Sequence, residues 1–170
     1  GSIDLIVCNA GTSIPITPKT FTAERFRNLV EVNLMGVINC IAVVLPSFLS
    51  RRQGYLAVMS SVAGYRGLPS ASAYGATKAA LINMCEGLKP DLEKFNIDIS
   101  VICPGFVKTP LTDKNDFPMP FIIKPEKAAE KILYGLKKRH FEINFPRRFT
   151  YFLKLGRFLP YTIYFFITRR

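Results

Sequence analysis

Residues 55–78 read YLAVMSSVAGYRGLPSASAYGATK, and this stretch decides the fold. Its first five residues form a short apolar run with the length and composition of a buried β-strand. Small residues and glycine then indicate a turn, and a helical pattern begins near Ser72. A strand that leads through a turn into a helix is one βα unit, so the stretch predicts a parallel sheet flanked by helices.

The same alternation of strands and helices continues on both sides of this stretch. Further strands are expected at residues 3–8 and 97–103, with a weaker candidate at 141–145. Apolar residues recur at three- and four-residue steps across about 22–50, 72–95 and 125–138, which predicts three amphipathic helices. The sequence therefore predicts an α/β fold with about four strands.

The composition favours one globular domain in the cytoplasm. Of the 170 residues, 49% are hydrophobic and 21% charged, so a sizeable core can form. Four cysteines lie in apolar runs without C-x-x-C spacing, which is typical of buried, reduced thiols rather than of disulfides or a metal site. No uninterrupted apolar run approaches the roughly 20 residues of a membrane-spanning helix, and no leader pattern is present. The start at Gly1 and Ser2, without methionine, indicates a fragment, a processed chain or a cloning scar.

Much of the net charge of +11 lies late in the chain, interleaved with Phe, Tyr and Leu. Residues 146–170 are interpreted as a basic, aromatic C-terminal extension of the domain formed by residues 1–145. This tail could lie on the surface of an anionic membrane, contact a second copy of the chain, or cover the substrate pocket. A nucleic-acid partner is not expected, because no RNA-binding motif accompanies the charge.

The carboxyl ends of the predicted strands carry the candidate chemistry, because ligands bind there in open α/β sheets. Tyr74 and Lys78 lie one helical turn apart, and an ammonium group beside a phenol lowers the phenol pKa from its usual value of about 10. Ser61, after the second strand, can hydrogen-bond the same substrate oxygen. None of these groups supplies a hydride, so redox chemistry at this site needs a nicotinamide cofactor.

The order of the motifs resembles the classical short-chain dehydrogenases/reductases. The motifs are Asn9-Ala10-Gly11, Asn33 within a helix, Ser60-Ser61-Val62-Ala63-Gly64, Tyr74-x-x-x-Lys78 and Pro104-Gly105, and together they cover most of residues 3–110. The resemblance implies a Rossmann-like, doubly wound parallel sheet of which only the C-terminal part is present. It also implies an NAD(P)-dependent oxidoreductase that interconverts a carbonyl and an alcohol.

Carried over by position, the resemblance implies a catalytic tetrad of Asn33, Ser61, Tyr74 and Lys78. Tyr74 would be the general acid/base and would also contact the cofactor, and Lys78 would lower the Tyr74 pKa and hold the nicotinamide ribose. Asn33 would anchor a water that relays protons to Lys78. Further cofactor contacts are implied at the following residues: Asn9, Ala10 and Gly11 near the adenosine, and Pro104, Gly105, Val107 and Thr109 around the carboxamide.

The resemblance leaves several properties open. The glycine-rich phosphate-binding turn of the family has no counterpart here, so the choice between NAD and NADP is not decided. Residues 111–123 correspond to the loop that covers the substrate, and their apolar character favours a lipophilic substrate. Homo-oligomers would form through the two long helices. The alternative function is a non-catalytic Rossmann-like binding or membrane-associated scaffold protein.

Overall fold

The computed structural model describes residues 1–113 and 117–169 of the chain. Its elements, in chain order, are β1 (Leu5–Cys8), α1 (Ala23–Val30), the π-helical segment η1 (Glu31–Met35), α2 (Gly36–Arg51), β2 (Gly54–Met59), the 3₁₀ turn η2 (Val62–Gly64), α3 (Ser72–Glu93), β3 (Ile97–Pro104), α4 (Pro125–Lys137), β4 (Glu142–Phe145), α5 (Arg147–Gly156) and α6 (Tyr161–Thr168). The four strands form one parallel sheet in the order β1-β2-β3-β4. The predicted α/β fold with about four parallel strands is confirmed.

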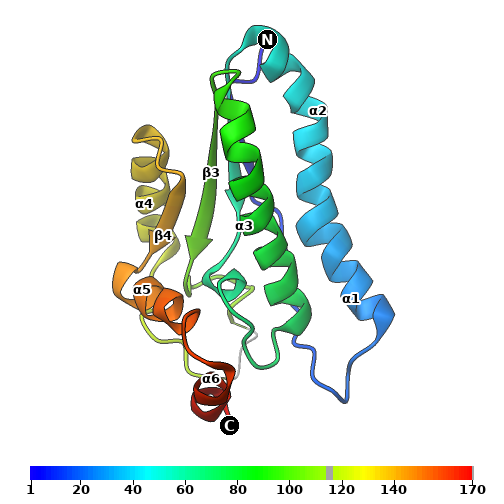
Figure 1. Cartoon of the computed structure of the whole chain (residues 1–170), viewed down its shortest axis with the longest axis vertical. Helices are drawn as coiled ribbons and strands as arrows, with labels where there is room; N and C mark the ends of the chain where they lie inside the picture. Colours follow the sequence, from blue (N-terminus) through cyan, green and yellow to red (C-terminus); the bar gives the residue numbers. More distant parts are fainter. Residues whose placement is uncertain (114–116, 170) are drawn as a thin grey trace.

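Helices cover both faces of the sheet (Figure 1). Alternate strand residues point to opposite faces, so Leu56 and Val58 pack against α2 and α3, whereas Ala57 and Ile102 pack against α4. The strands are apolar on both faces, as expected for a parallel sheet buried between helices. This three-layer arrangement places the carboxyl ends of β1, β2 and β3 at one edge of the sheet.

The first predicted long helix is present but contains an irregular turn. Thr22 caps its N-terminus by accepting a hydrogen bond from the Arg25 amide at 3.2 Å. Within η1 the Gly36 amide donates to the Glu31 carbonyl, a five-residue step that widens the helix at Asn33. Such π-turns occur often at functional sites, where they reorient a side chain.

Together α1, η1 and α2 form a helical segment, Ala23–Arg51, that is long and apolar enough to cross a membrane. The sequence prediction, which required an uninterrupted apolar run, did not identify it. One face of this segment packs in the core through Val37, Ile41 and Phe48. A core helix of a globular domain meets the same criterion of length and composition, and 28% of the apolar window of this segment is buried.

The core beneath α2 and α3 is closely fitted and contains three thiols. Phe48 is 0% exposed, and a methyl group added to Gly54 would approach its ring to 2.2 Å. Cys8, Cys85 and Cys103 belong to the same cluster. Cys40 is exposed, contrary to the expectation that all four thiols are buried, although its side chain interacts with the buried Cys8.

The first strand forms one border of the sheet. Among the described residues, β1 pairs with β2 alone, so the backbone groups along its other side have no strand partner. Leu5 and Val7 are each 43% exposed. Both side chains point to the face of the sheet on which α4 lies. Helix α4 covers only the other end of this face, against β3 and β4.

Candidate active site

Ser61 and Tyr74 meet at the carboxyl end of β2. Ser61 leaves the strand in an extended conformation, and its hydroxyl caps η2 by accepting from the Ala63 amide at 3.1 Å. Tyr74 lies in the first turn of α3, and a side-chain hydrogen bond joins it to Ser61. The serine is buried and the tyrosine half-buried, so the two hydroxyls lie at the border between the core and the solvent.

Lys78 is buried one turn further along α3. Its ammonium donates to the Met59 carbonyl at 2.8 Å and lies 5.7 Å from the centre of the Tyr74 ring. The carbonyl of Lys78 in turn accepts from the Ser60 hydroxyl at 2.8 Å. These contacts fasten the start of α3 to the end of β2, and they hold the ammonium beside the tyrosine.

Asn33 is fully buried and joins the other side of the site. Its side chain exchanges two hydrogen bonds with Thr12, accepting from the amide at 2.8 Å and donating to the carbonyl at 2.9 Å. It also contacts Thr77, whose hydroxyl donates to the Tyr74 carbonyl. The fold therefore brings all four residues predicted for the tetrad to one edge of the sheet.

Gly11 lies where Asn33 and Lys78 converge. A methyl group added to Gly11 would come 3.3 Å from Asn33 Oδ1 and 3.5 Å from Lys78 Nζ. The neighbouring Asn9 and Ala10 are exposed at the end of β1. Glycine thus lets this backbone pack closely against the Asn33 and Lys78 side chains.

The second group of predicted cofactor residues lies beyond the end of β3. Val107 forms an isolated bridge with Ile123, and the Thr109 amide donates to Thr112 at 2.9 Å. A methyl group on Gly105 would lie 3.2 Å from the Pro146 and Phe149 side chains. Gly105 therefore has a packing role against the start of α5 that the sequence did not reveal. Residues 114–116 of the predicted substrate loop lie outside the described residues.

Three contributors to the site were not predicted. Thr77 orients Asn33, and Met59 supplies the carbonyl that holds Lys78. Gly64 lies so close to α3 that a methyl group there would come 2.7 Å from the Lys78 backbone. Only Gly64 carried a signal in the sequence, because a glycine between a strand and a helix indicates a close approach.

The expected lowering of the Tyr74 pKa is wrong for this structure. Burial raises the pKa of Tyr74 above its usual value, and the hydrogen bond from Ser61 only partly opposes that effect. Burial also lowers the pKa of Lys78 to about 8. Both shifts favour the neutral form, because transfer out of water penalises charge. Tyr74 therefore keeps its proton at neutral pH, which suits a proton donor.

The buried thiols predict a loss of stability in alkali. Burial raises the pKa of Cys8 from 9.0 to about 11 and that of Cys85 and Cys103 to about 12. Above pH 9 the unfolded chain releases protons that the folded chain retains, so each thiol lowers the free energy of unfolding by about 1.4 kcal/mol per pH unit. Lys78 acts in the opposite direction between pH 8 and 10.5. The combined effect of three thiols on the free energy of unfolding exceeds the opposite effect of one lysine. Burial also raises the pKa of Tyr65, which adds to the loss of stability above pH 10.

Urea unfolding under reducing conditions, repeated from pH 8 to 11, measures this effect. We expect the midpoint to fall from pH 9 upward, and Cys85→Ala to make the fall shallower. A midpoint that rises over this range, or an equal slope in Cys85→Ala, would contradict the assignment.

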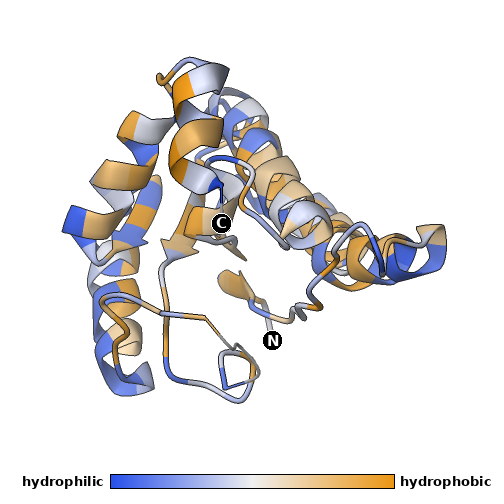
Figure 2. Ribbon diagram, turned by 90° about the horizontal axis from the view of Figure 1, so that it is seen from below, coloured by the Kyte–Doolittle hydropathy of each residue, from blue (hydrophilic) through white to orange (hydrophobic). Residues whose placement is uncertain are grey.

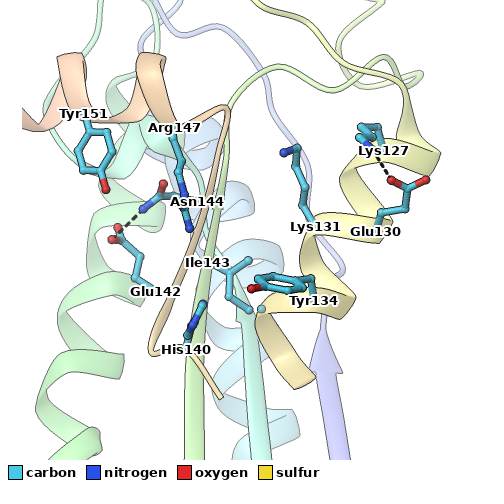
Figure 3. A pocket seen from close by; sticks show the side chains of 11 residues that line it. Lys127, Glu130, Lys131, Tyr134, His140, Glu142, Ile143, Asn144, Arg147 and Tyr151 are labelled. Atoms are coloured by element: carbon cyan, nitrogen blue, oxygen red, sulfur yellow. Dashed lines mark hydrogen bonds and ion pairs between the residues drawn. The ribbon is translucent and has the colours of Figure 1, made fainter. Parts of the chain in front are cut away.

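A hollow with a charged lining is separate from the site. It has a volume of about 570 Å³ and lies along the outer edge of β4, between α4 and α5 (Figure 3). Charged side chains such as Lys131, Glu142 and Arg147 line it, as does His140. None of the residues predicted for the site belongs to its lining.

A smaller, apolar cavity lies against the C-terminal helices. It has a volume of about 270 Å³ and lies between η2, α5 and α6. Its lining consists of Val62, Arg66, Leu68, Phe152, Leu153, Leu155, Gly156, Leu159, Tyr164, Ile167 and Thr168. Val62 directly follows Ser61 in the chain, but none of the residues predicted for the site lines this cavity.

Comparison with known proteins adds independent information. A family model described as short chain dehydrogenase matches residues 1–118. An uncharacterized oxidoreductase of Myxococcus xanthus (strain DK1622) is 35% identical over 170 residues, which are 100% of this chain and 67% of the relative.

Two solved structures show the similarity of fold. A short-chain dehydrogenase from Sphingobium yanoikuyae in complex with NADPH has a TM-score of 0.78 at 24% identity, over 85% of this chain and 57% of that one. A 3-oxoacyl-[acyl-carrier protein] reductase from Brucella melitensis with bound NAD has a TM-score of 0.72 at 26% identity, over 84% of this chain and 60% of that one. This chain therefore spans only part of the length of the proteins that it resembles.

Proposed function

The chain belongs to the short-chain dehydrogenase family, and on that premise we propose that it carries the proton-handling site of an NAD(P)-dependent oxidoreductase. The reaction is the interconversion of a carbonyl and an alcohol. The observation that carries the proposal is the convergence of Ser61, Tyr74 and Lys78 with Asn33 and Gly11. A surface pair of tyrosine and lysine would not require burial of the ammonium.

In the direction of reduction, Tyr74 donates its proton to the oxygen of the substrate carbonyl. A nicotinamide, when bound, supplies the hydride for the carbonyl carbon. Ser61 donates a hydrogen bond to the same oxygen and so stabilises the charge that develops there. The raised pKa of Tyr74 keeps the proton available at neutral pH, and the nearby ammonium of Lys78 stabilises the phenolate that remains.

The residues present fit the nicotinamide half of a dinucleotide. Gly11 is exposed and packs beside the Lys78 ammonium, and the segment from Pro104 to Thr109 continues the same edge of the sheet. Lys78 would hold the nicotinamide ribose, whereas Asn9 and Gly11 would lie near the adenosine. The Brucella reductase holds NAD and the Sphingobium protein holds NADPH, so both cofactors belong to the proposal.

We also propose that the substrate is lipophilic. The apolar cavity between η2, α5 and α6 supports this, because Leu68, Leu153 and Leu159 offer hydrocarbon surface to a substrate whose carbonyl reaches the site. Self-association through α2 and α3 stays a prediction. Val43 on α2 is exposed, in agreement with such a contact surface.

Titration with NADH and NADPH tests the proposed function. The chain and a longer form that includes the family's phosphate-binding turn are titrated side by side, and binding is followed by the fluorescence of the cofactor. We expect the longer form to bind at least one of them at micromolar concentration, because the phosphates gain a helix N-terminus. The chain alone should bind much more weakly. A longer form that is folded and binds neither cofactor would exclude the oxidoreductase.

A further inference from the structure

The end of the chain carries charge of a single sign. After Glu142 the sequence contains no acidic residue, and its basic residues are Arg147, Arg148, Lys154, Arg157, Arg169 and Arg170. Arg147 and Arg148 are exposed in the first turn of α5, and Arg157 is exposed just after that helix. Cations at the N-terminus of α5 oppose the helix dipole, so helix stability does not account for them.

The same segment exposes an unusual number of large apolar side chains. Those that do not line the cavity between η2, α5 and α6 are Tyr151, Phe158, Tyr161, Ile163, Phe165 and Phe166. Phe158 and Phe166 are 86% and 78% exposed. Figure 2 shows the helices beside the C-terminus from below, with hydrophobic residues coloured orange along them. These residues and the exposed arginines are called the tail surface below.

The fold orients the tail surface outward by fastening the opposite side of both helices. Tyr164 is the buried residue of α6, and its hydroxyl donates to the Gly67 carbonyl. The Arg66 guanidinium lies 3.8 Å from the centre of the Tyr164 ring and donates to the Gly156 and Leu159 carbonyls. Lys154 forms an ion pair with Glu142 from the inner side of α5. The exposed aromatic rings therefore belong to helices that are anchored to the rest of the fold, and not to a frayed chain end.

We propose that the tail surface docks on the surface of an anionic lipid bilayer. Aromatic and aliphatic side chains enter the interface between head groups and acyl chains, and the arginines contact the anionic head groups. Apolar side chains that remain in contact with water cost free energy, and soluble monomers rarely expose many of them side by side. Charge complementarity selects the bilayer over a second copy, because two tail surfaces would bring arginines of equal charge together.

Vesicle sedimentation with the full 170-residue chain tests the proposal. Vesicles of phosphatidylcholine alone are compared with vesicles in which one third of the lipid is phosphatidylglycerol, each at low and high salt. We expect binding to the anionic vesicles that weakens at high salt, and little binding to the neutral ones. Circular dichroism verifies that each variant is folded.

Two double variants, each with a matched control, distinguish the contribution of the tail surface to vesicle binding from that of the rest of the molecule. Arg147→Gln with Arg148→Gln should weaken binding roughly 25-fold, because each basic side chain near an anionic surface contributes about fivefold. The control Lys137→Gln with Lys138→Gln removes equal charge at the opposite end of the sheet, where β4 begins. It should change binding much less.

The second pair concerns the apolar side chains. Phe158→Ser with Phe166→Ser should weaken binding at least about tenfold, since both rings leave the interface. Ile3→Ser with Leu133→Ser removes exposed apolar side chains ahead of β1 and on α4, and should leave binding nearly unchanged.

Four results would overturn the proposal. They are no binding of the folded chain to anionic vesicles at low salt, equal binding to neutral vesicles, equal effects of variants and controls, and self-association in gel filtration that Phe158→Ser with Phe166→Ser abolishes. The last result would assign the tail surface to a second copy. A fifth result would also overturn it: displacement from vesicles by a single-stranded oligonucleotide, with loss of oligonucleotide binding in the phenylalanine variant as well, would assign the tail surface to nucleic acid.

Discussion

Replacement of Tyr74 by phenylalanine, in a form of the protein that binds the cofactor, is expected to lower kcat/KM by about 10²–10⁴. The ring remains in the first turn of α3, and only the hydroxyl that Ser61 contacts is lost. Without it no group in the site donates a proton to the carbonyl oxygen. Steady-state kinetics measure the loss, and cofactor titration should give an affinity within about twofold of the original, because the phenol acts on the substrate.

Tyr65→Phe is the matched control. Tyr65 is a buried tyrosine whose hydroxyl donates to Glu142 at 2.5 Å rather than to the site. The same atom is removed from the same kind of residue, so a general loss of packing or folding would affect both variants. We expect Tyr65→Phe to keep kcat/KM within a few-fold once the folded fraction is equal. Equal losses, or full activity in Tyr74→Phe, would favour the alternative of a non-catalytic binding protein.

Replacement of Phe48 by alanine is expected to lower the free energy of unfolding by about 3–5 kcal/mol. The ring is fully buried between α2 and β2, so its removal leaves a cavity that the surrounding strands cannot fill. A domain of this size has roughly 5–15 kcal/mol in total, so the variant should be partly unfolded at physiological temperature. Urea unfolding followed by circular dichroism measures the change.

Phe158→Ala removes the same ring from a position that is 86% exposed, and it should change the free energy of unfolding by about 0.5 kcal/mol or less. Gly54→Ala should also destabilise the chain, by about 1–3 kcal/mol, since its methyl group would overlap the Phe48 ring. Combining Gly54→Ala with Phe48→Leu should recover part of that loss, because the smaller side chain makes room. Losses that simply add would show that the two residues do not share a packing site.

The regular elements could be predicted because their patterns follow from burial. The strands around Leu56 and Ile99 are apolar on both faces, as any strand between two helical layers must be. The same holds for the stripe of α2, from Val37 to Phe48, which faces the sheet. The positions of Ser61, Tyr74 and Lys78 could also be predicted, since the order of the motifs fixes which strand ends they follow.

Other features depend on contacts that no local pattern contains. The π-turn at Asn33 requires one residue more per turn, and the apolar periodicity on either side of it conceals the shift. Helices α5 and α6 were not predicted as helices because Phe152 and Phe166 face the solvent, which breaks the rule that apolar stripes are buried. The pKa of Tyr74 was predicted in the wrong direction because the spacing to Lys78 is visible in the sequence, whereas the extent of burial is not.

The open border of β1 has a consequence for how this chain behaves in solution. Its unpaired amides and carbonyls, together with half-exposed Leu5 and Val7, form a template on which another extended segment can add. The segment that arrives first decides the outcome. A strand from the same protein would complete the sheet in register and restore a soluble molecule. The β1 of a neighbouring copy would instead join two sheets edge to edge, which is the first step of ordered aggregation.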